Sequence, residues 1–366
     1  MKISDIDKNL KVPETVKRDD IRWLSAKESC FRLYGACCDT PYRRLPEDVA
    51  AAANSGILAL STNTAGIRLR FRTDSPYVAI HAEWDHQTCF SHMPLTGVCG
   101  FDLYCVRNGR YKYAGTYTPP FVSKNGYESV VNTPGGMQDF VLDFPLYNNV
   151  STLYVGVSSA AKFEDPAGYK YEKPVIYYGS SITQGGCASR PGNSYQGMLT
   201  RALDADHVNL GFSGSARGEL SVAKFIGESP MSVFVYDYDH NAPSAEHLQA
   251  THYNFYKAVR DMRPDVPIVM LSMPEAELSI NPDLVAQWLA RRDIVKATFD
   301  KAKSEGDKNV YFIDGCSLFN GDELGVCTVD GAHPNDYGFH RFYEVLYPLL
   351  YKLLEETQNN NSHSQS

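Results

Sequence analysis

Two short segments of the chain carry the residue types that nucleophilic catalysis requires. Ser181 lies in a Gly-Ser-Ser run that directly follows the apolar stretch 175–178, and Asp330 and His333 lie three residues apart in a later loop. A serine hydroxyl is a weak nucleophile at neutral pH, so it needs a base, and the base needs an orienting partner. Asp330 can accept the Nδ1 proton of His333, which leaves Nε2 free to take the proton of Ser181. The spacing predicts a catalytic triad.

Two further segments could stabilise the negative charge that develops on an acyl oxygen during acyl transfer. The segment 209–215 leaves a predicted strand with two glycines, whose backbone N–H groups can approach a substrate without a Cβ in the way. Asn241 follows the next predicted strand, and its amide can donate a hydrogen bond. Alone, either turn is better explained as an ordinary connection between a strand and a helix. Their combination with Ser181 and His333 indicates a site.

The second half of the chain must position these residues. Continuous apolar runs at 175–178, 233–236, 268–271 and 310–313 are typical of strands buried on both faces of a parallel sheet. Helical patterns lie between them, at 194–203, from Ser244 to Arg260, from Asn281 to Lys303 and from Phe339 to Leu354. This alternation predicts a doubly wound α/β sheet of about five strands with helices on both sides. In such sheets, sites form beyond the carboxyl ends of the strands.

The first half has a different periodicity. Apolar and charged residues alternate at 67–72, and Val78, Ile80, Ala82 and Trp84 share one face of the run 78–84. Both patterns predict half-buried strands with one face toward the core and one toward water. Turn signals separate these runs and favour an all-β sandwich or jelly roll. We therefore expect a β-sandwich domain over 1–165, a catalytic α/β domain over 172–356 and a disordered tail over 357–366.

In order and content, the four segments resemble the SGNH hydrolases, also called the GDSL esterase family. Residues 330–334 match the family's Asp-x-x-His-Pro, the most specific of the four. The resemblance implies a flavodoxin-like doubly wound sheet and a serine esterase without cofactor or metal. It implies an oxyanion hole made by Ser181, Gly214 and Asn241. Two positions depart from the family: Ser180 stands where Asp is usual, and residues 239–242 replace Gly-x-Asn-Asp.

The first half carries its own resemblance. Residues 100–104, Gly-Phe-Asp-Leu-Tyr, match the Gly-x-Asp-Leu-Tyr run of a β domain that precedes SGNH domains in some bacterial proteins. Proteins with both domains include carbohydrate O-acyl esterases and an acyltransferase. The resemblance therefore implies hydrolysis of short-chain acyl esters, above all O-acetyl esters of carbohydrates. Acyl transfer by the same triad is the alternative.

Three other side chains are candidates for substrate binding. Arg190 and Arg217 follow the first two motifs and could bind a substrate carboxylate or hydroxyl, but each could instead pair with a neighbouring acid such as Glu219. Trp84 ends a predicted β strand and could stack on a sugar ring, although a structural aromatic residue is the favoured interpretation.

Two functions of other classes remain as alternatives. Asp237, Asp239, His240 and Asn241, with Asp330 and His333, could hold metals for phosphoester hydrolysis, but such sites usually need more carboxylates, and Ser181 would be idle. The spacing of His81, His86 and His92 does not favour a metal site either. A non-catalytic carbohydrate-binding protein would not need an intact set of Ser, His and Asp.

Composition limits the partners. The chain has 366 residues, 43% of them apolar, with a formal net charge of −8 and no long run of Lys or Arg, so nucleic acid is not an expected partner. No stretch approaches the roughly 18 apolar residues of a membrane span, and the start lacks a signal-peptide pattern. Nine scattered cysteines favour free thiols and a cytoplasmic location. The expected partner is a small-molecule or oligosaccharide ester, and the sequence leaves homo-oligomerisation open.

Overall fold

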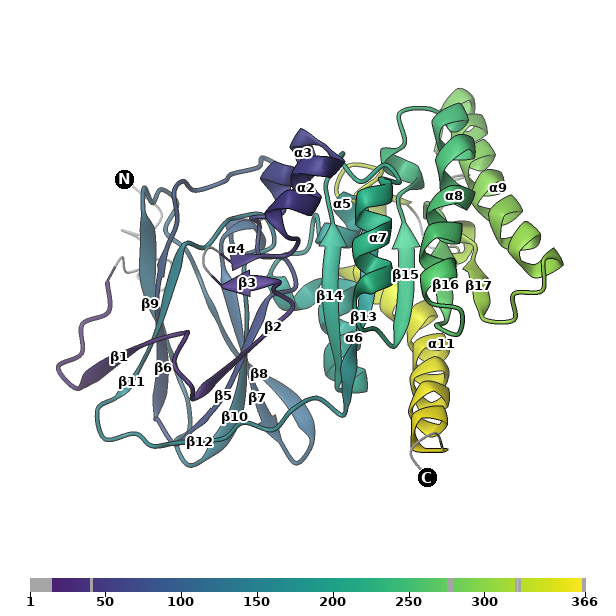
Figure 1. Cartoon of the computed structure of the whole chain (residues 1–366). Coiled ribbons are helices and arrows are strands. Elements are labelled where there is room, and N and C mark those ends of the chain that lie inside the picture. Colours follow the sequence, from purple (N-terminus) through teal and green to yellow (C-terminus); the bar gives the residue numbers. More distant parts are fainter. Residues whose placement is uncertain (1–14, 40–41, 275–278, 320, 322–323, 364–366) are drawn as a thin grey trace.

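The computed structural model describes residues 15–39, 42–274, 279–319, 321 and 324–363. They form two parts that lie side by side, an antiparallel β part and an α/β part built on a parallel sheet (Figure 1). The first strand of the parallel sheet is β13 (Tyr171–Gly179), and the chain reaches it from the β part through the short strand β12 (Phe163–Glu164).

The β part consists mainly of two antiparallel sheets that enclose a hydrophobic core. One sheet has the strand order β1-β11-β6-β9, and the other has the order β12-β5-β10-β7-β8, with β2 beside β5 and a small β3-β4 pair apart. This arrangement confirms the β-rich domain expected from the alternating pattern. The strands are β1 (Ile21–Ser25), β2 (Phe31–Tyr34), β3 (Cys38–Asp39), β4 (Tyr42–Arg43), β5 (Arg68–Thr73), β6 (Tyr77–Glu83), β7 (Phe101–Arg107), β8 (Arg110–Tyr117), β9 (Gly126–Asn132), β10 (Gln138–Asp143) and β11 (Thr152–Ser158).

Strand β5 corrects one expectation from the sequence. Its apolar residues Leu69 and Phe71 face the core, but Arg68 and Arg70 on the other face are only 2% exposed each, where water was expected. The α/β part covers this face. Arg68 donates to the carboxylate of Asp206 and to the carbonyl oxygen of His207, at 2.9 Å for the latter. The alternating pattern thus marks a face that is polar because it meets polar groups of the neighbouring part.

Among the described residues, three helices interrupt the first half, which the sequence indicated to be β from about residue 20 to 160. They are α2 (Glu47–Ala53), α3 (Ser55–Leu60) and α4 (Leu95–Val98). Ala50 and Ile57 of the first two are fully buried, and they belong to the same hydrophobic cluster as the α/β part. Packing against the second part therefore stabilises helices that are too short to be marked by periodicity.

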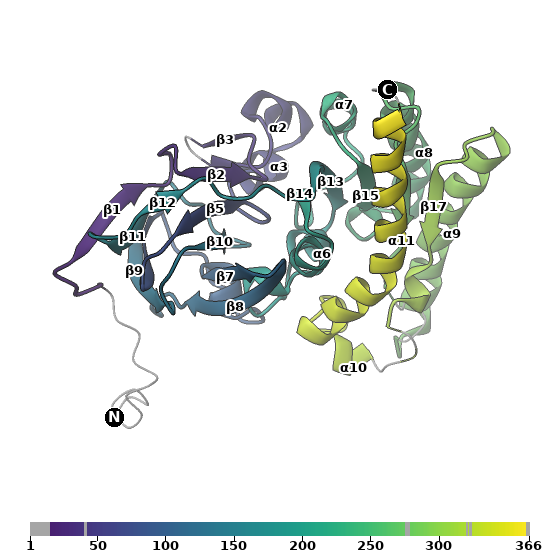
Figure 2. The ribbon, with the colours of Figure 1, turned by 90° about the horizontal axis from the view of Figure 1, so that it is seen from below.

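The α/β part has a five-stranded sheet with all neighbours parallel, in the order β14-β13-β15-β16-β17. This is the flavodoxin-like order 2-1-3-4-5, which confirms the expected fold. The order reverses at β13, and sites of such sheets lie beyond the carboxyl ends of the strands at that point. The edge strand β14 faces the β part (Figure 2). The remaining strands are β14 (Ala205–Gly211), β15 (Val233–Asp237), β16 (Ile268–Leu271) and β17 (Val310–Ile313).

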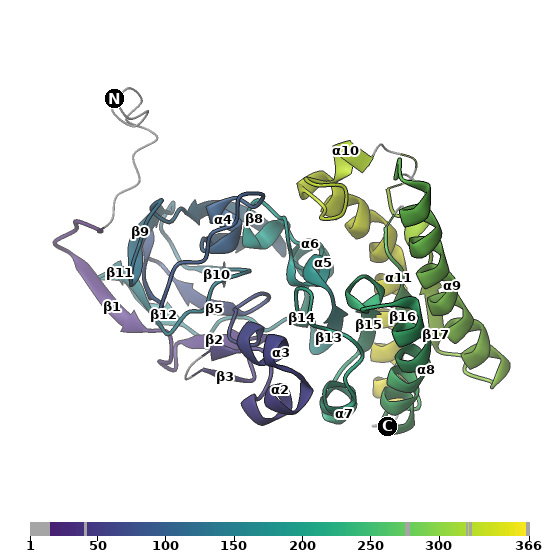
Figure 3. The same ribbon diagram turned by 90° about the horizontal axis from the view of Figure 1, so that it is seen from above.

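Helices cover both faces of this sheet (Figure 3). Alternate residues of each strand, such as Tyr177 and Tyr178 of β13, enter two different hydrophobic clusters. The cluster around Tyr177 contains residues of α6 and α11 and continues into the core of the β part. The other contains residues of α7, α8 and α9. The helices are α5 (Ser181–Gln184), α6 (Tyr195–Leu203), α7 (Leu220–Glu228), α8 (Ala245–Met262), α9 (Pro282–Ser304), α10 (Leu324–Cys327) and α11 (Asp336–His363).

Helices α6, α8 and α9 begin directly after the capping residues that the sequence indicated. Ser194, Ser244 and Asn281 accept hydrogen bonds from the first turns of α6, α8 and α9, and Pro282 is the first residue of α9. The last helix, α11, continues through His363, so the tail expected to be disordered from residue 357 begins inside a helix, and residues 364–366 lie outside the described part.

The described residues include all nine cysteines, and these are thiols that form no disulfide with one another. Within the described residues, every helix is too short or too polar to cross a bilayer.

Candidate active site

Ser181 lies just beyond the carboxyl end of β13, the strand at which the order of the parallel sheet reverses. The strand ends at Gly179, and Ser181 is the first residue of α5. The hydroxyl of Ser180 accepts a hydrogen bond from the N–H of Ile182 at 3.1 Å, so the residue that departs from the family pattern caps this short helix. A Cβ on Gly179 would lie 1.6 Å from Oδ1 of Asp237, which explains why glycine is needed at the turn.

The three residues predicted to form a triad are connected by hydrogen bonds. Ser181 Oγ lies 2.9 Å from Nε2 of His333, and Nδ1 of His333 lies 2.7 Å from Oδ2 of Asp330. The other oxygen of Asp330 accepts the backbone N–H groups of Ala332 at 3.0 Å and His333 at 2.8 Å. The loop therefore folds around the carboxylate, and this carboxylate fixes both the backbone and the ring of His333.

Electrostatics favour the ionised form of Asp330. Partial burial acts to raise its pKa, but the hydrogen bonds from His333 and Ala332 favour the charged carboxylate, and the net pKa is lowered. An ionised Asp330 accepts a hydrogen bond from Nδ1–H of His333 and keeps the proton on Nδ1. The lone pair of the neutral ring is therefore at Nε2, facing Ser181. The arrangement can remove a proton from the hydroxyl.

Gly214 and Asn241, expected as oxyanion donors, lie together beyond the ends of β14 and β15. Gly214 has a φ of 65°, and its N–H points to Oδ1 of Asn241 at 3.2 Å. Nδ2 of Asn241 donates to the carbonyl oxygen of Phe212 at 3.0 Å, and Phe212 N–H donates to Gly179 O at 2.9 Å. One hydrogen of Nδ2 thus orients the amide, and the second remains for another acceptor.

The three candidate substrate side chains have different surroundings. Arg190 donates to Asp102 at 2.8 Å and to Tyr104, the Asp and Tyr of the Gly-x-Asp-Leu-Tyr run, so its guanidinium joins the two parts of the molecule. Trp84 is 3% exposed and belongs to the core of the β part, as the favoured interpretation expected. Arg217 is exposed beside the site and donates to Gly214 O at 2.9 Å.

The β part contributes residues to this site that the sequence did not indicate. Tyr147 donates to the carbonyl oxygen of Ser181 at 3.1 Å, and its ring packs against Phe90 at 5.4 Å between centroids. Both rings line a cavity of about 550 Å³ together with Asn63, Asp85 and His86. Tyr147 and Phe90 lie in loops far from Ser181 in sequence, so spacing carried no signal for them.

Asp237 was also assigned no place in the triad, although it lies directly under the loop of Ser181. Its Oδ1 accepts from the hydroxyl of Thr183 and from Ser180 N–H, the latter at 3.3 Å. Burial raises its pKa to about 8, against the effect of the Thr183 hydrogen bond. Asp239 instead bonds the N–H groups of His240 and Met273, at 3.0 and 2.9 Å. Both carboxyl groups thus hold backbone segments in place.

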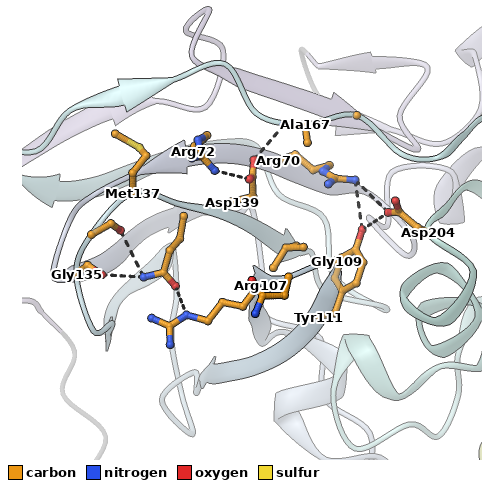
Figure 4. A pocket seen from close by; sticks show the side chains of 15 residues that line it. Arg70, Arg72, Arg107, Gly109, Tyr111, Gly135, Met137, Asp139, Ala167 and Asp204 are labelled. Atoms are coloured by element: carbon orange, nitrogen blue, oxygen red, sulfur yellow. Dashed lines mark hydrogen bonds and ion pairs between the residues drawn. The ribbon is translucent and has the colours of Figure 1, made fainter.

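A second cavity, of about 680 Å³, is lined mainly by residues of the β part (Figure 4). Asp204, which precedes β14, lines it and accepts from Tyr111 at 2.6 Å. Arg72 pairs with Asp139 at 2.7 Å across its wall. Serine, cysteine and histidine are absent from the described residues that line it, so a Ser-His or Cys-His pair is not found there.

Two family models match the chain. Residues 172–351 match the GDSL-like lipase/acylhydrolase family, and residues 21–163 match the GxDLY domain, described as the N-terminus of SGNH-hydrolase-type esterases. No curated protein matches the sequence.

Solved structures with the same arrangement are similar over most of the chain. A GDSL-like lipase from Bacteroides ovatus has a TM-score of 0.83 at 27% identity, with 92% of this chain and 98% of that chain covered. The salicylyl-acyltransferase SsfX3 from a tetracycline biosynthetic pathway has a TM-score of 0.73 at 22% identity, with 90% and 96% covered. The acetyl xylan esterase Est2A from Butyrivibrio proteoclasticus has a TM-score of 0.55 at 12% identity, with 92% and 99% covered. At these identities, the last two support the fold.

Proposed function

Because the chain belongs, over residues 172–351, to the GDSL-like lipase/acylhydrolase family, we propose that it hydrolyses short-chain acyl esters of carbohydrates through Ser181, His333 and Asp330. The chain is a carboxylic ester hydrolase by family, and the proposal concerns its substrate and its catalytic residues. The observation that carries it is the pair of hydrogen bonds, 2.9 Å and 2.7 Å long, that connect the three side chains.

In the first step, Nε2 of His333 takes the hydroxyl proton as Ser181 Oγ attacks the acyl carbonyl carbon. The carbonyl π electrons move onto oxygen and give a tetrahedral oxyanion. Asp330 stabilises the imidazolium through the Nδ1 hydrogen bond and stays ionised. His333 then gives its proton to the departing sugar hydroxyl, which leaves an acyl group on Ser181.

The oxyanion needs donors that are already in place. We assign this role to the N–H of Ser181, the second Nδ2 hydrogen of Asn241, and the N–H of Gly214. In the free enzyme Gly214 N–H is shared with Oδ1 of Asn241 at 3.2 Å, a long hydrogen bond that a charged oxygen can replace.

In the second step, water attacks the acyl-enzyme with His333 as base, and the acid leaves. If a second alcohol occupies the site before water, the same steps transfer the acyl group to it. The similarity to an acyltransferase, SsfX3, keeps this reaction as the second candidate.

A carbohydrate is the proposed alcohol because of the cavity lined by Tyr147, the residue whose hydroxyl donates to the carbonyl oxygen of Ser181. Its wall combines an exposed ring, Phe90 at 39% exposure, with polar side chains of Asp85 and His86. Sugars offer an apolar face for a ring and hydroxyls for polar groups. Structural neighbours include carbohydrate esterases, one of which is solved with cellohexaose.

The decisive experiment compares acetate release from acetylated oligosaccharides with the hydrolysis of p-nitrophenyl esters of increasing acyl length. We expect acetyl esters to be preferred and Ser181→Ala to lower kcat by at least about 10³-fold, because the triad acts as a unit. Ser180→Ala is the matched control, since it removes a helix cap one residue away but keeps the nucleophile.

Retention of most activity by Ser181→Ala would overturn the assignment. Loss of activity with EDTA would favour the metal-dependent phosphoesterase instead. No turnover of any acyl ester by the folded protein would favour a non-catalytic carbohydrate-binding protein.

A further inference from the structure

A histidine of the β part reaches the proposed triad from outside. His92 follows β6 in sequence, and its ring lies 5.7 Å from the ring of His333 between centroids. The ring of Phe90 packs against the ring of His92 at 5.8 Å between centroids, and the neighbouring Met93 is only 5% exposed. Among the described residues, the ring nitrogens of His92 have no hydrogen-bond partner, unlike those of His333.

His92, Asp330 and His333 together offer the ligands of a metal ion. One ring nitrogen of each histidine and one carboxylate oxygen all lie within 4.8 Å of one another. We propose that these three side chains bind a divalent transition-metal cation of the zinc type, and that the bound cation switches the esterase off. The inhibitory effect rests on the proposed function, whereas the binding does not.

The ligand set indicates the kind of metal. Two imidazoles and one carboxylate suit Zn²⁺, which takes three protein ligands and one water in open tetrahedral sites at about 2.0–2.2 Å. Mg²⁺ and Ca²⁺ need six or more oxygens, which this cluster does not offer. His92 and Asp330 are exposed, so a cation can arrive from solvent and the ring of His92 can turn to complete the site.

Inhibition follows from the electronic structure of imidazole. A neutral ring has a single nitrogen with an available lone pair, and catalysis needs that lone pair at Nε2. A cation at Nε2 occupies it directly. A cation at Nδ1 displaces the proton there to Nε2, which then has no free lone pair, and it also takes Asp330 away from its hydrogen bond. In either case His333 cannot accept the Ser181 proton, so metal binding and catalysis exclude each other.

Binding is tested without any activity. The full chain carrying Ser181→Ala is titrated with ZnCl₂ by calorimetry and with CoCl₂ by visible absorption, since cobalt in a site of low coordination number absorbs visibly. We expect one site per chain. His92→Gln should weaken binding by at least about 10-fold, because loss of a ligand costs at least as much as loss of a group that orients one. His86→Gln, an exposed histidine nearby, is the matched control and should bind as before.

Inhibition is tested on the wild-type sequence and on both histidine variants, each compared with its own rate in EDTA. We expect ZnCl₂ to inhibit the wild type and His86→Gln, EDTA to restore activity, and His92→Gln to need at least about 10-fold more zinc. Circular dichroism checks that the variants fold, and His92→Asn serves as the second substitution.

Equal zinc affinity of His92→Gln and the wild type would overturn the site, as would the absence of any binding. If the protein binds zinc through His92 but hydrolyses no ester, the proposed function fails and the metal site stands. If it hydrolyses esters and zinc bound through His92 leaves the rate unchanged, the inhibitory switch fails alone.

Discussion

Asn241 makes two contacts, one as a hydrogen-bond acceptor and one as a donor, which a side-chain amide can make at once. Its Oδ1 accepts from Gly214 N–H at 3.2 Å, and its Nδ2 donates to Phe212 O at 3.0 Å. An amide is both acceptor and donor, whereas a carboxylate accepts only. The residue therefore orients the Gly214 loop and, in the proposed mechanism, supplies a hydrogen to the oxyanion.

Asn241→Ala should lower kcat by about 10²–10³-fold with little change in KM, because the donor acts mainly in the transition state. Asn241→Asp separates the two contacts, since it keeps an acceptor for Gly214 N–H and loses both donors. We expect it to be as impaired as Asn241→Ala in steady-state kinetics. Near wild-type kcat in Asn241→Asp would contradict the donor role.

The elements beneath the site meet at the ends of β13 and β15. Asp237 ends β15 and holds Ser180 N–H and the Thr183 hydroxyl of the neighbouring loop. At 7% exposure its carboxyl is shielded from water, and this burial raises its pKa to about 8. At neutral pH it is therefore a neutral acid within the folded protein, although it is ionised in the unfolded chain.

This difference predicts a pH-dependent stability. In the folded protein Asp237 keeps its proton up to about pH 8, whereas in the unfolded chain it loses the proton near its ordinary pKa of 3.8. The contribution of Asp237 to the free energy of unfolding is therefore fully present below pH 3.8 and decreases as the pH rises toward 8. The side chain of the Asp237→Asn variant does not titrate, so this variant lacks that pH dependence. The melting temperature of the wild type relative to Asp237→Asn should fall by more than about 2 °C from pH 5 to pH 8. A constant difference in calorimetric scans would contradict the raised pKa.

Buried polar contacts join the two parts of the molecule. The fully buried carboxylate of Asp102 accepts hydrogen bonds from Arg190 Nη1 at 2.8 Å and from Gly192 N–H at 2.9 Å. The hydroxyl of Tyr104 also accepts a hydrogen bond from Arg190. Arg44 of the β part donates to the carbonyl oxygens of Asn209 and Gly211, at 3.0 and 2.7 Å, near the site. The Gly-x-Asp-Leu-Tyr run thus fixes the loop that follows Ser181, and the β part is a structural component of the site.

Arg190→Met should lower the free energy of unfolding by about 3 kcal/mol, because it leaves the carboxylate of Asp102 buried without its cation. The double variant Arg190→Met with Asp102→Asn should recover part of this loss, since the buried charge is then absent. Denaturant unfolding, followed by circular dichroism and fluorescence, measures both. A stable Arg190→Met protein with a greatly raised KM would instead support the substrate-binding role.

Local patterns in the sequence determined the parallel sheet, the capped starts of α6, α8 and α9, and the order of the four segments around Ser181. Each of these depends on residues close in sequence: apolar runs, a capping side chain, or an Asp three residues before a His. The pairing of Asp330 with His333 belongs here too, because the loop folds around its own carboxylate.

The tertiary structure decided the features that depend on contacts between segments distant in sequence. Arg68 and Arg70 are buried because the α/β part covers β5, which alternation alone assigns to water. Tyr147 and His92 reach the site from loops of the β part, and Asp237 changes its pKa because other elements exclude water from it. Such contacts depend on which surfaces meet, and a strand or loop carries no local record of the surface that will cover it.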